Sequence, residues 1–196
     1  MTEKLPENPD IEPLTRTQVL VAMGVTAVVL LIGAKIWMNF SDIILLPIKW
    51  TGTTIPLGIG IGLAITAASS LIYRLWPAYR FSADFYLALV LKPLLWPDLI
   101  WLGLLPGLSE ELLFRGVMLS WLGFNMTGVT VSSICFGILH LSGWQQWPYA
   151  VWATTVGLLL GYSAIETNNL LVPIIAHIVT NIVSSLIWKI EHKNDI

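Results

Sequence analysis

The sequence predicts an all-α protein, a polytopic bundle of about six to eight transmembrane helices, some short or broken, with a polar intramembrane cavity. Of its 196 residues, 56% are hydrophobic and only 11% are charged. Soluble domains usually carry about 25% charged residues. The net charge of −2 gives no indication of nucleic acid as a partner, and a single cysteine excludes an internal disulfide.

Two apolar runs in the N-terminal half are long enough to cross a membrane. Residues 19–38 form the first and residues 54–75 the second, and about 20 residues suffice for a hydrocarbon core. The run at 43–50 is too short to span and is predicted to lie at the interface. The preceding segment is polar and lacks the features of a cleavable leader, so we expect a disordered tail over residues 1–17.

The middle of the chain predicts a broken helix. A lysine and two prolines interrupt the apolar run at 85–105, and prolines in a membrane span free backbone groups that need new partners. Pro106 and Gly107 predict a further break, and Ser109 is a candidate N-cap. A new helix is therefore expected to begin at Ser109 or the next residue, with two glutamates in its first turn near the positive end of the helix dipole.

Three more apolar segments complete the predicted bundle, at residues 129–141, 149–165 and 171–190. The polar or aromatic connectors "SGWQQWPY" and "ETNN" separate them. No repeat or second domain interrupts the pattern, which indicates a single bundle.

The C-terminal half carries a short set of polar side chains within these apolar segments. They are Glu110, Glu111, Arg115, His140, His177 and Asn181. An ionised side chain at the centre of a membrane helix costs roughly 2.5–3.5 kcal/mol. Ionisable residues in such places indicate a functional site, and here three separate helices contribute them.

The two adjacent glutamates are predicted to have different partners. Glu111 and Arg115 are four residues apart, so they share a helix face and can form a charge-assisted pair. Glu110 points about 100° away and is free to face another helix. A purely structural ion pair remains an open interpretation of Glu111 with Arg115.

The same spacing recurs on two later helices. Phe136 and His140 are four residues apart, and so are His177 and Asn181. A buried histidine can be no more than a hydrogen-bonded core residue, and an asparagine can simply hold two helices together. Their occurrence together with the glutamates favours a functional site.

A carboxylate, two histidines and an asparagine suit the hydrolysis of a peptide bond without a covalent intermediate. The carboxylate and one imidazole can activate a water, while the second imidazole and the amide stabilise the oxyanion. Histidine and carboxylate also bind zinc, but the HExxH spacing of zinc proteases is absent. No metal or cofactor is favoured, and zinc stays open with Glu110, His140 and His177 as its ligands.

Three short motifs occur in order along this half of the chain. "EELLFR" at 110–115 fits EExxxR, "FGILH" at 136–140 fits FxxxH, and "HIVTN" at 177–181 fits HxxxN. Together they resemble the CaaX protease and bacteriocin-processing family (CPBP, or Abi) of intramembrane endopeptidases. The similarity covers about residues 95–190 and includes "GLLLGYSAIETNNLLVPIIAH" at 157–177.

The resemblance implies a role for each motif position. Glu110 would be the water-activating base, assisted by His140, and His177 with Asn181 would stabilise the oxyanion. Supporting roles would fall to Glu111, Arg115 and Phe136. Although the family was long described as metalloproteases, a glutamate mechanism without metal is the one we favour.

These observations predict the organisation of the whole chain: a polar tail (1–17), N-terminal transmembrane helices (18–94), a catalytic core (95–190) and a polar tail (191–196). The expected partners are the lipid bilayer and a peptide or membrane-protein substrate, prenylated or not. We expect a multi-pass protein of the plasma membrane or of an internal membrane such as the thylakoid.

Three other functions stay open at this point. Members of the same family are thought to act as non-catalytic scaffolds, immunity factors or assembly partners of membrane proteins. "GYSA" at 161–164 raises a rhomboid-like serine protease with Ser163 as nucleophile, which leaves the glutamates unexplained. Buried Glu and His could serve a proton-coupled transporter, but the chain shows no inverted repeat of spans.

Overall fold

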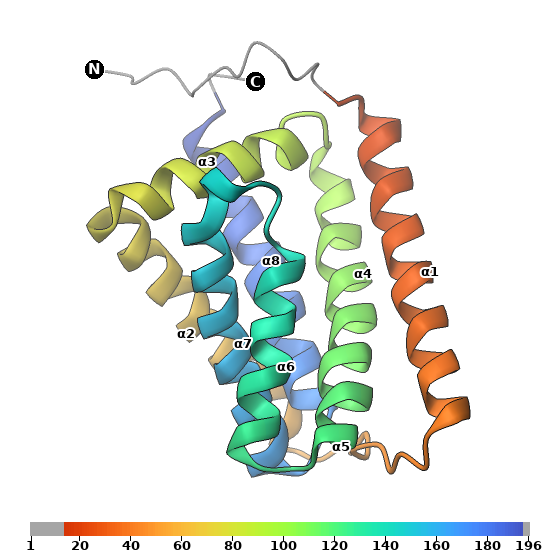
Figure 1. Cartoon of the computed structure of the whole chain (residues 1–196). Coiled ribbons are helices and arrows are strands. Elements are labelled where there is room, and N and C mark those ends of the chain that lie inside the picture. Colours follow the sequence, from red (N-terminus) through yellow and green to blue (C-terminus); the bar gives the residue numbers. More distant parts are fainter. Residues whose placement is uncertain (1–13, 194–196) are drawn as a thin grey trace.

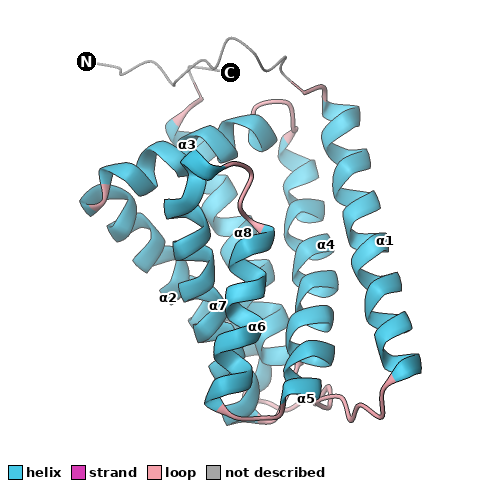
Figure 2. Ribbon diagram, viewed as in Figure 1, coloured by secondary structure: helices cyan, strands magenta, loops and turns pink. Residues whose placement is uncertain are grey.

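The computed structural model describes residues 14–193, and within this range the chain is helical and contains no strand (Figures 1 and 2). The α-helices are α1 (Arg16–Phe40), α2 (Thr54–Leu75), α3 (Pro77–Leu91), α4 (Leu99–Glu111), α5 (Leu119–Leu122), α6 (Met126–Leu139), α7 (Trp147–Thr167) and α8 (Leu171–Glu191). Short 3-10 helices cover Trp96–Asp98 and Trp144–Gln146, and a π-helix covers Leu112–Met118. The predicted all-α class is confirmed.

The helices include four that are long and apolar enough to cross a membrane: α1, α2, the continuous segment 144–167, and α8. Helix α3 and the segment 96–122 would form a fifth span if counted together, but they are bent by 110° relative to each other. This bend confirms the predicted break between residues 92 and 97. Lengths and composition of this kind are those of a membrane protein.

The first helix starts slightly earlier than predicted. The Thr15 hydroxyl accepts a hydrogen bond from the Gln18 amide at 3.3 Å, and the Gln18 side chain accepts one from the Thr15 amide at 2.8 Å. This capping box begins α1 at Arg16, so the predicted tail over residues 1–17 ends two residues too late. The rest of that tail, and residues 194–196 of the C-terminal tail, lie outside the described residues.

The predicted interfacial segment at 43–50 has no regular secondary structure. It is held by the turn between α7 and α8, where the Asn169 amide donates to the Lys49 carbonyl at 2.8 Å and accepts from the Lys49 amide at 3.0 Å. Its depth in a bilayer stays a prediction.

Helix α8 is central, because it packs against α2 on one side and α4 on the other. Glycines make these contacts close: a Cβ added at Gly107 of α4 would lie 2.5 Å from the Ile178 side chain, and one added at Gly62 of α2 would lie 2.6 Å from the Ala176 carbonyl. Small residues allow helix backbones in lipid to approach in this way. The approach brings the polar side chains of α4 and α8 into contact.

Helix α3 lies across one end of the bundle, at the end where α1 begins and α8 ends (Figure 1). The Tyr73 hydroxyl of α2 donates to the Asp84 carboxylate of α3 at 2.7 Å. Tyr79 and Tyr86 of α3 stack on Tyr149 of α7, with ring centroids 6.1 and 4.8 Å apart. These contacts hold α3 against the rest of the bundle.

The predicted helix start at Ser109 is wrong. Helix α4 runs from Leu99 to Glu111 without interruption at Pro106, and the Ser109 hydroxyl donates to the Leu105 carbonyl at 2.7 Å instead of capping a helix. Both glutamates therefore end α4 and lead directly into the π-helix. They do not begin a helix of their own, so the predicted stabilisation by that helix's dipole does not apply.

A contact with another helix explains why α4 continues through proline. Pro106 has no amide hydrogen, so the carbonyl of Leu102, four residues earlier, loses its helical partner. That carbonyl accepts a hydrogen bond from the Asn181 side-chain amide of α8 at 3.4 Å. A neighbouring helix thus satisfies the freed backbone group, as membrane proteins require.

Candidate active site

A cavity of about 470 Å³ lies between α2, α3, α4, α7 and α8. Its wall includes the four side chains predicted to be catalytic: Glu110, His140, His177 and Asn181. Serines of α2 and α8 and tyrosines of α3 and α7 continue the wall away from these residues. The fold therefore places all four candidates around one cavity.

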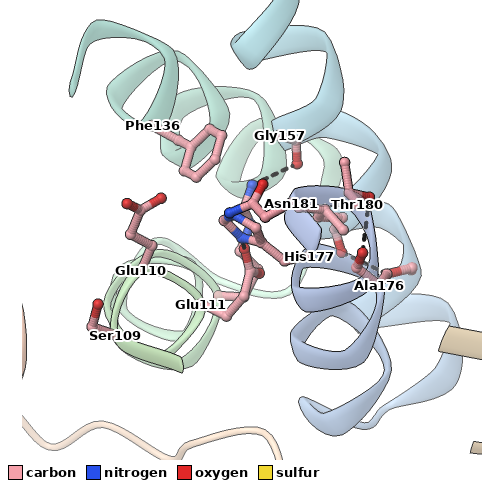
Figure 3. Close-up of polar contacts among 12 residues, drawn as sticks. Ser109, Glu110, Glu111, Phe136, Gly157, Ala176, His177, Thr180 and Asn181 are labelled. Atoms are coloured by element: carbon pink, nitrogen blue, oxygen red, sulfur yellow. Dashed lines mark hydrogen bonds and ion pairs between the residues drawn. The ribbon is translucent and has the colours of Figure 1, made fainter. Parts of the chain in front are cut away.

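The predicted pair of Glu111 with Arg115 is present and is part of a larger network. Glu111 Oε1 accepts from Arg115 Nη1 and from His177 Nδ1, both at 2.7 Å. Arg115 Nη2 donates to the Gly157 carbonyl of α7 at 3.0 Å. Figure 3 shows Glu111 directed at His177, on the side of the helix away from Glu110.

The ion pair in this network is completely buried, since neither Glu111 nor Arg115 exposes any surface. A carboxylate accepts but does not donate, so the proton between Glu111 and His177 belongs to His177 Nδ1. Because the hydrogen bonds join the α4 region to α7 and α8, they fix the orientation of the His177 ring.

Phe136 separates the ion pair from His140. Its ring lies 4.5 Å from the Arg115 guanidinium carbon, a cation–π distance. The same ring is 4.6 Å from the His140 ring and 5.8 Å from the His177 ring, measured between centroids. Phe136 thus packs against both histidines and covers the arginine.

Glu110 has a different environment from its neighbour. It is 8% exposed and lines the cavity, which Glu111 does not. One oxygen of each carboxylate, Oε2, has no hydrogen-bond partner within residues 14–193. Glu110 Oε2 lies 3.9 Å from His140 Nε2. This separation is too long for a direct hydrogen bond but allows one water to contact both atoms.

The hydrogen bond on the far side of His140 determines which nitrogen faces Glu110. His140 Nδ1 lies 2.9 Å from the Phe136 carbonyl, which can only accept, so Nδ1 carries the proton. In the neutral ring, Nε2 then presents its lone pair to the space beside Glu110. Two hydrogen-bond acceptors, His140 Nε2 and Glu110 Oε2, therefore face the same small space between them.

His177 and Asn181 lie side by side on α8, one turn apart (Figure 3). His177 is 5% exposed and its Nδ1 atom is engaged by Glu111, so Nε2 is the nitrogen left for other contacts. Asn181 is half-buried, and its amide donates to the Leu102 carbonyl.

Several features of the site were not predicted. The π-helix Leu112–Met118 begins directly after Glu111 and contains Arg115, and such turns occur frequently at functional sites. The Gly157 carbonyl binds Arg115, and the only signal for it was its place in the glycine-containing segment at 157–177. Tyr86 and Tyr149 approach the site only because α3 and α7 meet in the fold.

The arrangement does not fit a zinc site with three protein ligands. Within the part of the chain that the structure describes, no three His, Cys, Asp or Glu side chains gather closely enough to hold a metal ion. Of the three candidate ligands, His177 bonds to Glu111, while His140 faces Glu110.

Ser163, the nucleophile of the rhomboid-like alternative, lies outside the cavity wall. It is buried, and its hydroxyl donates to the Leu160 carbonyl in its own helix at 2.8 Å. This placement suits helix packing and offers no support for a serine nucleophile.

The fold and the site together define a helical membrane protein with a buried carboxylate–histidine centre. Residues 92–183 match the family model described as Rce1-like, the type II CAAX prenyl endopeptidases. The uncharacterized protein YpbD of Bacillus subtilis (strain 168) is 27% identical over 135 residues, which cover 69% of this chain and 69% of that protein. No solved structure matches the chain.

Over residues 92–183 the chain is therefore similar to the Rce1-like family, in agreement with the resemblance carried by the three motifs. This similarity supports a CAAX-type intramembrane protease at the level of the family.

Proposed function

We propose that the protein is a multi-pass intramembrane endopeptidase that hydrolyses a peptide bond with water activated by Glu110. One observation carries the proposal: a buried carboxylate lines the cavity with an oxygen that has no hydrogen-bond partner in residues 14–193, 3.9 Å from a histidine nitrogen. Such an oxygen is available to accept a proton from a water beside it.

In the first step, a water donates one hydrogen bond to Glu110 Oε2 and one to His140 Nε2. The water oxygen attacks the carbonyl carbon of the scissile peptide, and its lost proton passes to Glu110. His140 orients the water, since its other nitrogen is held by the Phe136 carbonyl. The products of this step are protonated Glu110 and a tetrahedral oxyanion.

The oxyanion needs hydrogen-bond donors, and α8 can supply two. Because His177 Nδ1 donates to Glu111, Nε2 can donate as well only when the ring carries two protons. Glu111 then lies between two cations, this ring and Arg115, and the remaining positive charge favours the oxyanion. The second donor is the Asn181 side-chain amide, one helical turn further along.

In the second step, Glu110 returns its proton to the nitrogen of the leaving group, and the carbon–nitrogen bond breaks. A carboxylic acid and an amine leave, and Glu110 is ionised again. No protein atom becomes covalently attached to the substrate, and no metal takes part.

The substrate in this proposal is a peptide or membrane-protein segment that reaches the cavity from the bilayer. A prenylated C-terminal CAAX peptide is the first class to test, because the family description names it. An unprenylated peptide of the same sequence tests whether the lipid is needed.

The experiment compares the purified full-length protein with Glu110→Gln, both reconstituted in liposomes. Internally quenched CAAX peptides, farnesylated or unmodified, report cleavage. We expect Glu110→Gln to lower kcat by about 10²–10⁴-fold, the usual contribution of a general base. Glu166→Gln, which alters an exposed carboxylate of α7 away from the cavity, is the matched control and should keep the wild-type kcat.

A parallel experiment in cells identifies the natural substrate. The new protein termini in membranes from wild-type cells are compared with those from cells that carry Glu110→Gln. If Glu110→Gln keeps the full biological function, catalysis is not how the protein acts, and the role is that of a non-catalytic membrane partner.

A further inference from the structure

Pro106 has no part in the mechanism, yet it lies inside α4 and lines the same cavity as Glu110. A proline in the interior of a helix removes one backbone hydrogen bond and is destabilising. The position needs an explanation, because alanine would suit the helix better.

The missing hydrogen bond is the one that would have joined the amide of residue 106 to the Leu102 carbonyl. Within residues 14–193, that carbonyl accepts instead from Asn181 Nδ2 at 3.4 Å, and the Asn181 side chain makes no other hydrogen bond. Leu102, Pro106 and Asn181 all line the cavity. Because Pro106 has no amide hydrogen, the Leu102 carbonyl is free to accept the hydrogen bond from the Asn181 side chain.

An asparagine amide is planar and carries two N–H groups on one nitrogen. When one N–H is directed at the Leu102 carbonyl, the plane of the amide is restricted and the second N–H keeps a defined direction. A donor aimed in advance at the developing charge is worth far more to catalysis than one that must first be reoriented.

We propose that Pro106 is a positioning residue for Asn181: it frees the Leu102 carbonyl, and this carbonyl orients the Asn181 amide as an oxyanion donor. The inference rests on the proposed function of Asn181. Helix α4 gives up a backbone hydrogen bond, and the site gains an ordered side chain.

The consequence is an unusual pair of effects in Pro106→Ala. The new amide at residue 106 bonds to Leu102, so the melting temperature rises by several degrees. The Asn181 amide loses its partner, so kcat falls by about tenfold to a hundredfold, while KM stays within twofold. If Pro106 only shaped the helix, the effects of Pro106→Ala would not depend on Asn181.

The test is a double-mutant cycle of Pro106→Ala and Asn181→Ala in liposomes, read by melting temperature and by cleavage of the farnesylated, internally quenched CAAX peptide. We expect Asn181→Ala to lower the melting temperature in the wild type but not in Pro106→Ala, where Leu102 already has a backbone donor. We also expect Pro106→Ala to cause no further loss of kcat in Asn181→Ala. Pro56→Ala, in the first turn of α2, is the control and should leave both readouts unchanged.

Each contrary outcome has a distinct meaning. If Asn181→Ala itself keeps the wild-type kcat, the oxyanion role in the proposed function fails, and the positioning role fails with it. If Asn181→Ala loses activity but Pro106→Ala keeps it, only the positioning role fails. It also fails if Pro106→Ala adds its full loss of kcat to that of Asn181→Ala, because the proline would then act through the shape of α4.

Discussion

The buried network around Arg115 makes the sharpest prediction about stability. Arg115 is 0% exposed, donates to Glu111 at 2.7 Å and to the Gly157 carbonyl at 3.0 Å, and covers the Phe136 ring. Replacing it by methionine keeps the volume but leaves the Glu111 carboxylate without its cation. Removing one partner of a buried ion pair costs about 3–5 kcal/mol.

The lower part of that range applies here, because Glu111 keeps a second partner. His177 Nδ1 still donates to Glu111 at 2.7 Å. When both nitrogens of the His177 ring carry a proton, the ring can replace the lost positive charge. We therefore expect Arg115→Met to lower the free energy of unfolding by about 3 kcal/mol.

Titration with SDS from a mild detergent, followed by tryptophan fluorescence, measures this change in a chain that carries ten tryptophans. Arg115→Lys is the matched control: it keeps the charge but cannot reach Glu111 and Gly157 together, so an intermediate loss is expected. The double variant Glu111→Gln with Arg115→Met should be destabilised by less than the sum of the single variants. A loss below about 1 kcal/mol for Arg115→Met would refute the reasoning, since it would place the pair among exposed ion pairs.

Three further predictions concern packing, the metal and the serine. Gly107→Val should destabilise the bundle by about 1–3 kcal/mol, because a Cβ there would lie 2.5 Å from Ile178; an unchanged SDS midpoint would show that α4 and α8 can separate freely. Cleavage of the quenched peptide should survive a zinc chelator, and loss of activity that zinc restores would overturn the metal-free mechanism. Ser163→Ala should cleave at the wild-type rate, and labelling of Ser163 by a fluorophosphonate probe would contradict its packing role beside Leu160.

The helices themselves could be predicted from the sequence, since hydropathy and length are local properties. The apolar run at 54–75 coincides with α2, and the run at 171–190 ends one residue before α8 does. The pairing of Glu111 with Arg115 was equally predictable, because side chains four residues apart share a helix face.

The path of α4 could not be predicted in this way. Local rules for Pro106, Gly107 and Ser109 favour a helix break, yet the helix continues. The decisive partner is Asn181, whose amide bonds to the carbonyl that the proline frees, that of Leu102, 79 residues away along the chain. Sequence-local propensities contain no information about such a donor.

The sequence by itself determined that this is an all-α membrane protein similar to the Rce1-like family, and it singled out four side chains that line the cavity. Only the tertiary structure decided how the polar side chains divide between two tasks. Glu111 is engaged by Arg115 and His177 and is not part of the cavity wall, while Glu110 lines the cavity with an oxygen 3.9 Å from His140. The division depends on distances between helices, and helix packing sets these distances after the local pattern has determined the helices.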